Sequence, residues 1–354
     1  MTRTAVIFSP KYYQHNTGTG HPESAKRLGA IINELKKSKL SKSKSWQFVQ
    51  PDKATLEDVQ LVHDLDYIKT VDRICKSGGG ILDEGDTVVS PESFQVALYA
   101  VGGTLKAVDL VMNNTFQNAF ALIRPPGHHA SKLSAMGFCI FNNTAIAATH
   151  LLKRHKLNRI AIIDIDAHHG NGTQETFYET SHVLYTSLHE DPHSFPRTGF
   201  TDEIGEGEGL GYSVNVPLPF QTGDRIYLKA FREIVTPIIR QYKPQFILVS
   251  AGFDGHYTDP VGNLSLSMKS YQKAYETIVR LASETCEGRL VSILEGGYSL
   301  THIGKTATTA IAEMSGKTMI MKDRVQASTQ RSIRQGLNII EDAKKAHKAF
   351  WRLQ

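Results

Sequence analysis

Short apolar runs alternate along the chain with longer stretches in which apolar residues recur every three or four positions. Six runs have the length of strands and are apolar on both faces, as strands covered by helices are. They are residues 6–8, 120–123, 159–165, 182–188, 246–251 and 290–294. Segments 92–112, 143–155 and 227–242 have helical spacing, and we expect Pro237 to kink the last helix or to begin its second half. This alternation predicts a doubly wound α/β sheet.

Three further segments do not fit this alternation. Residues 38–45 are basic and polar, and we expect a solvated loop there. Residues 190–219 are rich in Gly, Pro and acidic residues, which predicts a long ordered loop of the kind that is often functional. Residues 331–354 predict an amphipathic helix with a basic face that packs back on the domain. No linker or internal repeat divides the chain.

Composition narrows the class of protein. Hydrophobic residues make up 40% of the chain and charged residues 21%, which excludes a mainly disordered protein. The net charge of +5 is too small to indicate a nucleic-acid partner. We find no apolar run near the roughly 20 residues of a membrane helix, and the first apolar stretch is too short for a secretory signal. Cys75, Cys139 and Cys286 are far apart, which favours free thiols and a cytoplasmic protein.

Chemically reactive residues follow four of the predicted strands. RPPGHHA follows residues 120–123, DAHHGNGTQ follows 159–165, GFDGH follows 246–251 and EGGY follows 290–294. Ligands of open α/β sheets bind beyond the carboxyl ends of the strands. We therefore expect these histidines, aspartates and the tyrosine to gather in one site.

A metal site is the first candidate within this group. Asp164, Asp166 and His168 occupy alternate positions of an extended segment, so their side chains point to the same side. Asp254 can complete a ligand set from another strand. The set of Asp166, His168 and Asp254 leaves a position for water, which is typical of catalytic zinc, and its oxygen atoms also suit Fe(II), Co(II) or Mn(II).

Two adjacent histidines, His128 and His129, are the candidates for proton transfer. The prolines before them stiffen the loop, and Gly127 permits an unusual backbone conformation. An imidazole can take a proton from a metal-bound water and later supply one to a leaving amine. Beside a metal site, this pair predicts a general acid–base function.

Other candidates surround this pair. Tyr298 follows two glycines, so its hydroxyl is a candidate donor to a developing oxyanion. Glu295 is either a metal ligand or a hydrogen-bonding group, and we favour hydrogen bonding. Phe138 and Phe195 are candidates for apolar walls.

The motifs RPPGHHA, MGFCIFNN, DIDAHHGNGTQ, SAGFD and EGGY resemble those of zinc-dependent histone deacetylases and acetylpolyamine amidohydrolases. HPESAKRL (21–28) and DTVVSPES (86–93) add to the resemblance, which spans about residues 6–310 and is closer to the class II branch. It implies an arginase-like, three-layer α/β fold with a mostly parallel, eight-stranded sheet between helices. It also implies that residues 1–354 form one catalytic domain.

The resemblance also implies a role for each matched residue, in metal binding, proton transfer or substrate contact. The matches are Asp166, His168 and Asp254 as zinc ligands; His129 as general base and acid; His128, oriented by Asp164, as its electrostatic partner; Tyr298 as oxyanion donor; Phe138, Phe195 and Gly137 at the acyl-lysine channel; Asp86 as a rim carboxylate that holds the substrate; and Arg27 near an acetate-release cavity. The family also binds structural potassium, at one site through Asp164, Asp166, His168, Ser187 and Leu188 and at a second through Phe177, Thr180, Val183 and Tyr212.

Three positions bear on the branch and the substrate. Asn171 stands where class I members have Asp and class II members have Asn. Arg197 replaces a usual glycine, and we expect it to place a cation near the mouth of the site that disfavours polyamines. Val261 occupies the position at which a polyamine-specific member has a glutamate gatekeeper, which weakens the case for polyamine substrates.

The resulting hypothesis is hydrolysis of N-acyl amides on lysine side chains or lysine-like amines, in proteins, peptides or small acylated amines. An acetylpolyamine amidohydrolase is the alternative. A ureohydrolase shares the fold but binds two manganese ions with more aspartates, whereas this chain has DAHHG and no second aspartate two residues after Asp254. A non-catalytic acyl-lysine-binding protein would have lost a ligand, a histidine or the tyrosine, and none is lost. We expect no nucleic-acid or membrane partner, and a homo-oligomer stays open.

Overall fold

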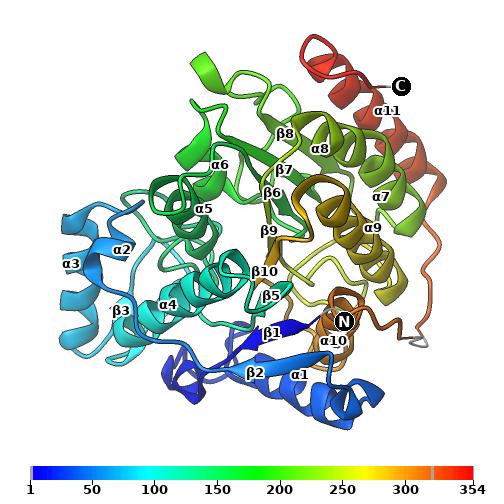
Figure 1. Cartoon of the computed structure of the whole chain (residues 1–354). Helices are drawn as coiled ribbons and strands as arrows, with labels where there is room; N and C mark the ends of the chain where they lie inside the picture. The colour runs from blue at the N-terminus through cyan, green and yellow to red at the C-terminus, as the bar shows by residue number, and fades with distance from the viewer. Residues whose placement is uncertain (1–2, 320–322, 354) are drawn as a thin grey trace.

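An eight-stranded, all-parallel sheet forms the centre of the molecule in the computed structural model, which describes residues 3–319 and 323–353 (Figure 1). The strands lie in the order β2-β1-β5-β10-β9-β6-β7-β8. Their bounds are β1 Thr4–Ile7, β2 Trp46–Val49, β5 Asn118–Ala121, β6 Ile160–Asp164, β7 Val183–Glu190, β8 Ser213–Leu218, β9 Phe246–Ala251 and β10 Leu290–Leu294. Every residue in these strands except those of β2 is buried, as a sheet covered on both faces requires. The predicted α/β fold with eight strands is confirmed.

Helices cover both faces of the sheet (Figure 1). One face carries α2 Leu56–Val59, α3 Leu65–Lys76, α4 Ser93–Met112, α5 Asn143–Lys153 and α6 Asn171–Phe177. The other carries α1 Lys26–Lys37, α7 Asp224–Ala230, α8 Thr236–Tyr242, α9 Met268–Cys286 and α10 Ile303–Met314. A small antiparallel pair, β3 Gly80–Ile81 and β4 Val88–Val89, lies outside the main sheet. Cys75, Cys139 and Cys286 are free, as predicted, and all three are buried.

The segment with Pro237 is divided as predicted. Helix α7 continues through a π-helical turn, Phe231–Val235, into α8, and Pro237 stands in the first turn of α8. Proline is tolerated there because the first amides of a helix have no partner within the helix.

Two expectations about the chain were wrong. Residues 190–219 are not all loop, because Ser213–Leu218 forms the edge strand β8. Its sequence, SVNVPL, hides the strand because polar residues and Pro217 interrupt the apolar run, and proline is tolerated at a sheet edge. Residues 38–45 contain a short 3-10 helix, Lys39–Lys42, that buries Leu40.

Helix α4 lies where the spacing over residues 92–112 predicts it, but it contradicts the expectation that no segment approaches the apolar length of a membrane helix. This helix has 20 residues and is long and apolar enough to cross a membrane by length and composition alone. Most of it is buried within the molecule, where it packs against β1, β5 and α5.

The C-terminal helix α11, Gln330–His347, packs back on the domain as predicted. It lies against β8 and α7, and Lys344 forms an ion pair of 2.9 Å with Glu233 of the π-helical turn. Beyond the helix, the Trp351 indole N–H donates to the Gly211 carbonyl at 2.8 Å.

Candidate functional site

The predicted site residues meet at the carboxyl edge of the sheet, in the loops that follow β5, β6, β9 and β10. The register aligns Asp164 at the end of β6 with Ser250 of β9 and Ser187 of β7. Because all four strands run in the same direction, their end loops are brought to one place although they are far apart in the sequence.

Asp166, His168 and Asp254 form a compact, buried group whose donor atoms all lie within 4.8 Å of one another. The Nδ1 atom of His168 is 3.3 Å from Asp166 Oδ1 and 3.2 Å from Asp254 Oδ2. Asp254 Oδ2 has no hydrogen-bond partner among the described residues, although it is buried. Two carboxylates and one imidazole around such an unsatisfied oxygen fit a divalent cation.

The backbone beside this group leaves room only for glycine. A Cβ atom at Gly296 would overlap the carboxylates of both Asp166 and Asp254, and one at Gly252 would overlap that of Asp166. The two glycines let the strand ends come close to the carboxylates, and the amide of Gly296 donates to Asp166 Oδ2 at 2.8 Å.

The charges of these three side chains also fit a divalent cation. Burial opposes the charged form of His168, yet the nearby carboxylates of Asp166 and Asp254 raise its pKa well above the usual value. Burial favours neutral Asp166, but the imidazoles of His128 and His168 lower its pKa. The carboxylates therefore hold a proton on His168, and a divalent cation bound between the same atoms would replace that positive charge.

His128 and His129 lie side by side, with ring centroids 4.0 Å apart, and differ in charge. Burial opposes the charged form of His128, but Asp166 and Asp164 raise its pKa to about 10, and its Nδ1 is 3.1 Å from Asp164 Oδ2. Burial and the neighbouring charge of His128 lower the pKa of His129 well below its usual value. At neutral pH the pair contains one cation and one neutral base.

Asn171 fixes the orientation of the His129 ring. Its Nδ2 donates to the backbone carbonyl of His129 at 3.3 Å, so its Oδ1 is the atom that faces His129 Nδ1, at 2.8 Å. The Nδ1–H of His129 therefore donates to Asn171, which leaves Nε2 as the proton acceptor.

Glu295 lies behind the histidine loop. Its carboxylate accepts from the amides of Gly127, at 2.6 Å, and His128, at 3.2 Å, and from the Thr144 hydroxyl, at 3.2 Å. Burial raises the pKa of Glu295 to about 7. This arrangement agrees with the hydrogen-bonding interpretation of Glu295, which holds the loop in place.

Tyr298 is held by its backbone and by its ring. Asp259 accepts from the amides of Tyr298, at 2.6 Å, and Ser299, at 2.9 Å. The Phe138 ring lies 5.6 Å from the tyrosine ring, centroid to centroid. Gly297 before it has a φ of +112°, a conformation that favours glycine.

His129, Asp166, His168 and Tyr298 line one cavity of about 280 Å³. Its lining comprises Asp86, His129, Gly137, Phe138, Asp166, His168, Glu190, Ser194, Phe195, Val261, Asn263 and Tyr298. The predicted apolar walls lie against the reactive groups: the Phe195 ring is 4.9 Å from the ring of His129 and 5.8 Å from that of His168. A Cβ atom at Gly137 would approach His129 Cδ2 to 2.6 Å, so glycine keeps the wall close to the base.

Two arginines lie outside this lining. Arg27 is fully buried, and its guanidinium donates to the carbonyls of Gly297, at 2.7 Å, and Glu295 and to the carboxylate of Glu23. Arg197 is exposed and does not line the cavity, so the structure does not support the expected cation at the mouth. The backbone of Arg197 is left-handed, with a φ of +68°.

Sequence reasoning missed Glu190 and Asn263 in the cavity wall. Glu190 accepts from Asn263 Nδ2 at 2.9 Å, and its Oε1 lies 3.7 Å from His168 Nε2. Glu190 is the last residue of β7, which was predicted to end at residue 188. Had this strand been extended to residue 190, the expectation that site residues follow the carboxyl ends of strands would have identified Glu190.

At each proposed potassium site, strand register or hydrogen bonds bring some of the proposed ligands close together. Asp164 aligns with Ser187, and the Asp164 carboxylate accepts from the Tyr185 hydroxyl at 3.2 Å. Phe177 ends α6 and Val183 begins β7, with the Thr180 amide donating to the Phe177 carbonyl at 3.3 Å. Potassium binding at both sites stays a prediction.

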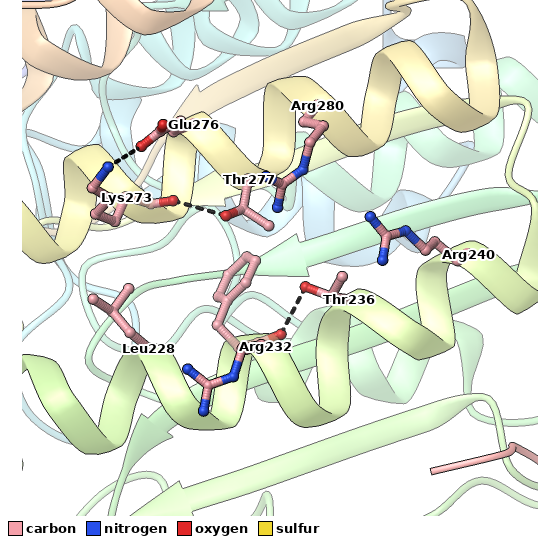
Figure 2. A pocket seen from close by; sticks show the side chains of 9 residues that line it. Leu228, Arg232, Thr236, Arg240, Lys273, Glu276, Thr277 and Arg280 are labelled. Carbon is pink, nitrogen blue, oxygen red and sulfur yellow. Dashed lines mark hydrogen bonds and ion pairs between the residues drawn. The ribbon is translucent and has the colours of Figure 1, made fainter. Parts of the chain in front are cut away.

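Another depression lies between the α7–α8 segment and α9 (Figure 2). It is rich in cations, but these are paired with neighbouring glutamates. Arg240 forms two hydrogen bonds with Glu284, at 2.9 and 3.2 Å, and Lys273 lies 2.6 Å from Glu276. The paired charges and lack of a catalytic group in its lining distinguish this depression from the cavity at the strand ends.

The parallel sheet and the carboxylate–histidine group at its carboxyl edge agree with the deacetylase class of hydrolases that the sequence motifs resemble. The model of the histone deacetylase domain matches residues 21–314, and the chain belongs to that family. A probable deacetylase of Archaeoglobus fulgidus is 39% identical over 99% of both chains. A histone deacetylase-like amidohydrolase of Pseudomonas aeruginosa is 36% identical over 88% of this chain and 81% of its own length.

A solved structure shows the same fold. The crystal structure of the HDA15 HD domain has a TM-score of 0.88 and 32% sequence identity, and the match covers 99% of this chain and 95% of that one. The predicted family, its fold and its enzymatic class are confirmed.

Proposed function

We propose that this deacetylase-family enzyme is a zinc-dependent deacylase of lysine side chains or lysine-like amines. Its products are a carboxylate and a free amine. One observation carries the proposal: a neutral histidine base, His129, and a tyrosine, Tyr298, line the same cavity as two members, Asp166 and His168, of the Asp166–His168–Asp254 group. An acylated lysine peptide or protein, or a small acylated amine, is the partner that this site implies.

Asp166, His168 and Asp254 would hold the zinc ion, with Fe(II) or Co(II) as substitutes that the donor set also suits. When bound, zinc supplies a Lewis acid that polarises the substrate carbonyl and activates water. The unsatisfied Asp254 oxygen and the two glycines beside the carboxylates support this assignment.

His129 carries the proton between water and amine. Its Nε2 accepts a proton as the water oxygen bonds to the carbonyl carbon, and the charged ring then donates that proton to the amine nitrogen as the C–N bond breaks. Asn171 keeps the acceptor nitrogen facing the cavity. The cationic His128 beside it, held by Asp164, keeps His129 neutral before the reaction.

Tyr298 donates its hydroxyl hydrogen to the carbonyl oxygen as that oxygen gains negative charge. Burial raises the pKa of Tyr298 well above its usual value, so the hydroxyl keeps its proton. Phe138 and Phe195 enclose the neutral acylated stem and exclude water. Each of these groups acts on a substrate that enters as an uncharged amide.

A small cationic substrate is a second candidate, and two carboxylates favour it. Asp86 and Glu190 line the cavity, whose lining contains no lysine or arginine. The free amines of an acetylpolyamine would be attracted by this charge. Val261 stands at the gatekeeper position in place of a glutamate and so favours the acylated lysine substrate.

A substrate panel tests both candidates. We expect the zinc-loaded enzyme to hydrolyse an acetyl-lysine peptide or a trifluoroacetyl-lysine reporter with a higher kcat/KM than acetylspermidine and acetylputrescine. Higher values for the polyamines would favour the second candidate. In that case Glu190→Gln should lower kcat/KM for acetylspermidine roughly tenfold more than for the neutral reporter.

Variants at the reactive groups test the chemistry itself. His129→Ala should nearly abolish turnover while zinc stays bound, and chelation should abolish activity that zinc then restores. Full activity after removal of the metal would contradict the mechanism. No turnover on any substrate with zinc bound would instead support the non-catalytic acyl-lysine-binding protein.

A further inference from the structure

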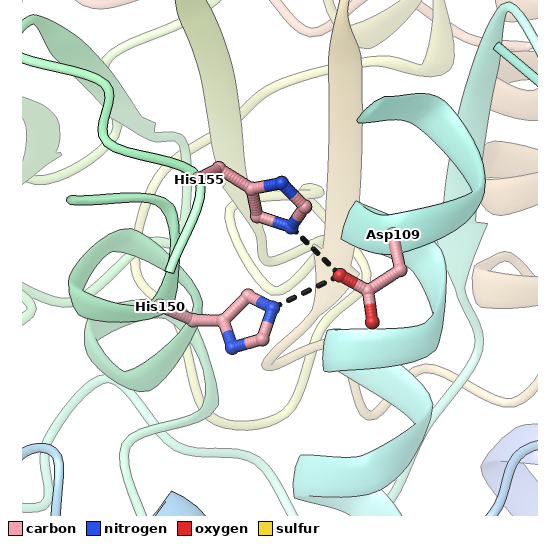
Figure 3. A group of neighbouring side chains, drawn as sticks. All are labelled: Asp109, His150 and His155. Atoms are coloured by element: carbon pink, nitrogen blue, oxygen red, sulfur yellow. Dashed lines mark hydrogen bonds and ion pairs between the residues drawn. The ribbon is translucent and has the colours of Figure 1, made fainter. Parts of the chain in front are cut away.

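A second group of histidine and aspartate side chains, close enough together to hold a metal ion, lies near the amino ends of the strands, away from the cavity. Asp109 stands in the last turn of α4, His150 in the last turn of α5 and His155 just beyond it (Figure 3). Helix α4 leads into β5 and α5 leads into β6, so both helices end where these strands begin. Because the cavity stands at the carboxyl ends of the strands, the length of the sheet separates the two groups.

The two imidazoles converge on one carboxylate oxygen. His150 Nε2 lies 2.9 Å and His155 Nε2 lies 2.8 Å from the same atom, Asp109 Oδ1. Figure 3 shows both rings pointing at this oxygen from the α5 side. All three donor atoms lie within 4.8 Å of one another.

These distances are close to those of a coordinated ion. With metal–ligand distances of about 2.0–2.1 Å and tetrahedral angles, neighbouring donor atoms are roughly 3.3 Å apart. The observed N–O distances need to open by only about half an ångström to reach that value, which side-chain rotations can supply. The three donors are therefore already arranged for an ion to replace the two hydrogen bonds.

The surroundings suit a cation that enters from solvent. The Asp109 side chain is 42% exposed and that of His155 is 21% exposed, so water can complete the coordination. His150 is buried, and its Nδ1 has no hydrogen-bond partner among the described residues, so Asp109 alone holds its ring. The C-terminal ends of α4 and α5 carry partial negative charge, which favours a cation between them.

We propose that Asp109, His150 and His155 bind one divalent transition metal ion, with zinc as the most suitable and Co(II) or Ni(II) as substitutes. Two imidazole nitrogens and one carboxylate oxygen form a donor set that binds these metals more tightly than it binds magnesium or calcium. The ion joins the end of α4 to the end of α5 and so stabilises one helical layer, and it takes no part in the reaction at the cavity.

Metal analysis after equilibrium dialysis against Zn2+ tests this site. The wild-type protein should bind two equivalents. Asp254→Asn, which disables the cavity group, and His155→Gln, which disables the outer group, should each bind one, and the double variant should bind none. His182→Gln, at a histidine outside both groups, is the matched control and should bind two.

Three further measurements separate this site from the catalytic one: zinc affinity, deacylase activity and Tm. Asp109→Asn should weaken the outer zinc site at least tenfold, and deacylase activity should stay at the wild-type level in this variant and in His155→Gln. Zinc should raise the Tm of Asp254→Asn but not that of the double variant. Equal zinc binding by wild type and His155→Gln would overturn the outer site and show a hydrogen-bonded triad only. Loss of both equivalents in Asp254→Asn would overturn it as well, whereas unchanged binding in Asp254→Asn would count against the zinc assignment at the cavity.

Discussion

The Arg27 guanidinium lies over the ring of Tyr298, with its central carbon 4.9 Å from the ring centroid. The same group donates to the Gly297 carbonyl, at 2.7 Å, and to the Glu295 carbonyl. Arg27 thus contacts the ring of Tyr298 and two of the three residues that precede it in the chain. The planar guanidinium of Arg27 stacks on the tyrosine ring while its fixed N–H donors bind the backbone, so it holds Tyr298 in position.

Arg27→Lys should therefore impair Tyr298 without removing the buried charge. Lysine keeps a cation beside Glu23 but cannot stack on the ring while donating to two carbonyls. We expect kcat to fall about tenfold or more with KM and zinc content little changed, since a small misplacement of a reacting group is costly. Arg289→Lys, which alters a similar arginine–carbonyl bond away from the cavity, is the control for steady-state kinetics. An equal loss in that control would show a general structural effect.

Tyr298→Phe removes one hydroxyl from the cavity. We expect kcat to fall at least about a hundredfold, as for other single oxyanion donors. Tyr257→Phe loses a hydroxyl that bonds to Asp323 outside the cavity, and it should keep wild-type kcat. Near-normal turnover by Tyr298→Phe under saturating substrate would remove this residue from the mechanism.

Asn171→Asp should move the acidic limb of the kcat/KM profile to higher pH. A carboxylate facing His129 Nδ1 favours the protonated ring and raises its pKa, so less neutral base is present at a given acidic pH. We expect a shift of at least about one pH unit. Asn171→Ala removes the acceptor without adding charge and should not shift the limb upward. An unchanged profile in Asn171→Asp would show that His129 does not control this limb.

His347→Leu should stabilise the protein most in acid. His347 is fully buried in α11, both ring nitrogens lack partners among the described residues, and burial lowers its pKa to about 4. Between pH 6.5 and 4 the unfolded chain binds a proton that the folded chain does not, so folding stability falls as the pH falls through this window. Leucine does not titrate, so the variant should not lose this stability in acid.

Urea unfolding at pH 7.5 and pH 5.0 measures the effect. The gain in unfolding free energy for His347→Leu should be larger at pH 5.0 by roughly 1–2 kcal/mol. His193→Gln, at an exposed histidine, serves as the control and should have the pH dependence of the wild type. A gain of the same size at both pH values would show that packing alone explains it.

The sequence was sufficient for the strands that meet at the site, because buried parallel strands are continuous apolar runs and reactive residues follow their ends. It was not sufficient for β2 and β8, which lie at the two edges of the sheet. Edge strands are exposed or interrupted by polar residues, and Pro217 made β8 resemble a loop. The helical spacing over residues 92–112 did locate α4, which spans Ser93–Met112.

The candidate site, too, could be predicted only in part. The two-residue spacing placed Asp166 and His168 on one side of the chain, and the shared direction of the strands placed Asp254 beside them. Contacts set by side-chain packing were beyond this reasoning, such as Arg27 beneath the tyrosine or Glu190 against Asn263. Asp109, His150 and His155 carry no motif at all, and only the packing of α4 on α5 brings them together.

The position of α11 has a consequence for self-association. Strand β8 ends the sheet, and an uncovered edge offers unpaired backbone groups to which a strand of another molecule can add. Since α11 lies against β8 and Trp351 caps the Gly211 carbonyl just before it, the last segment of the chain shields this end of the sheet against aggregation by strand addition.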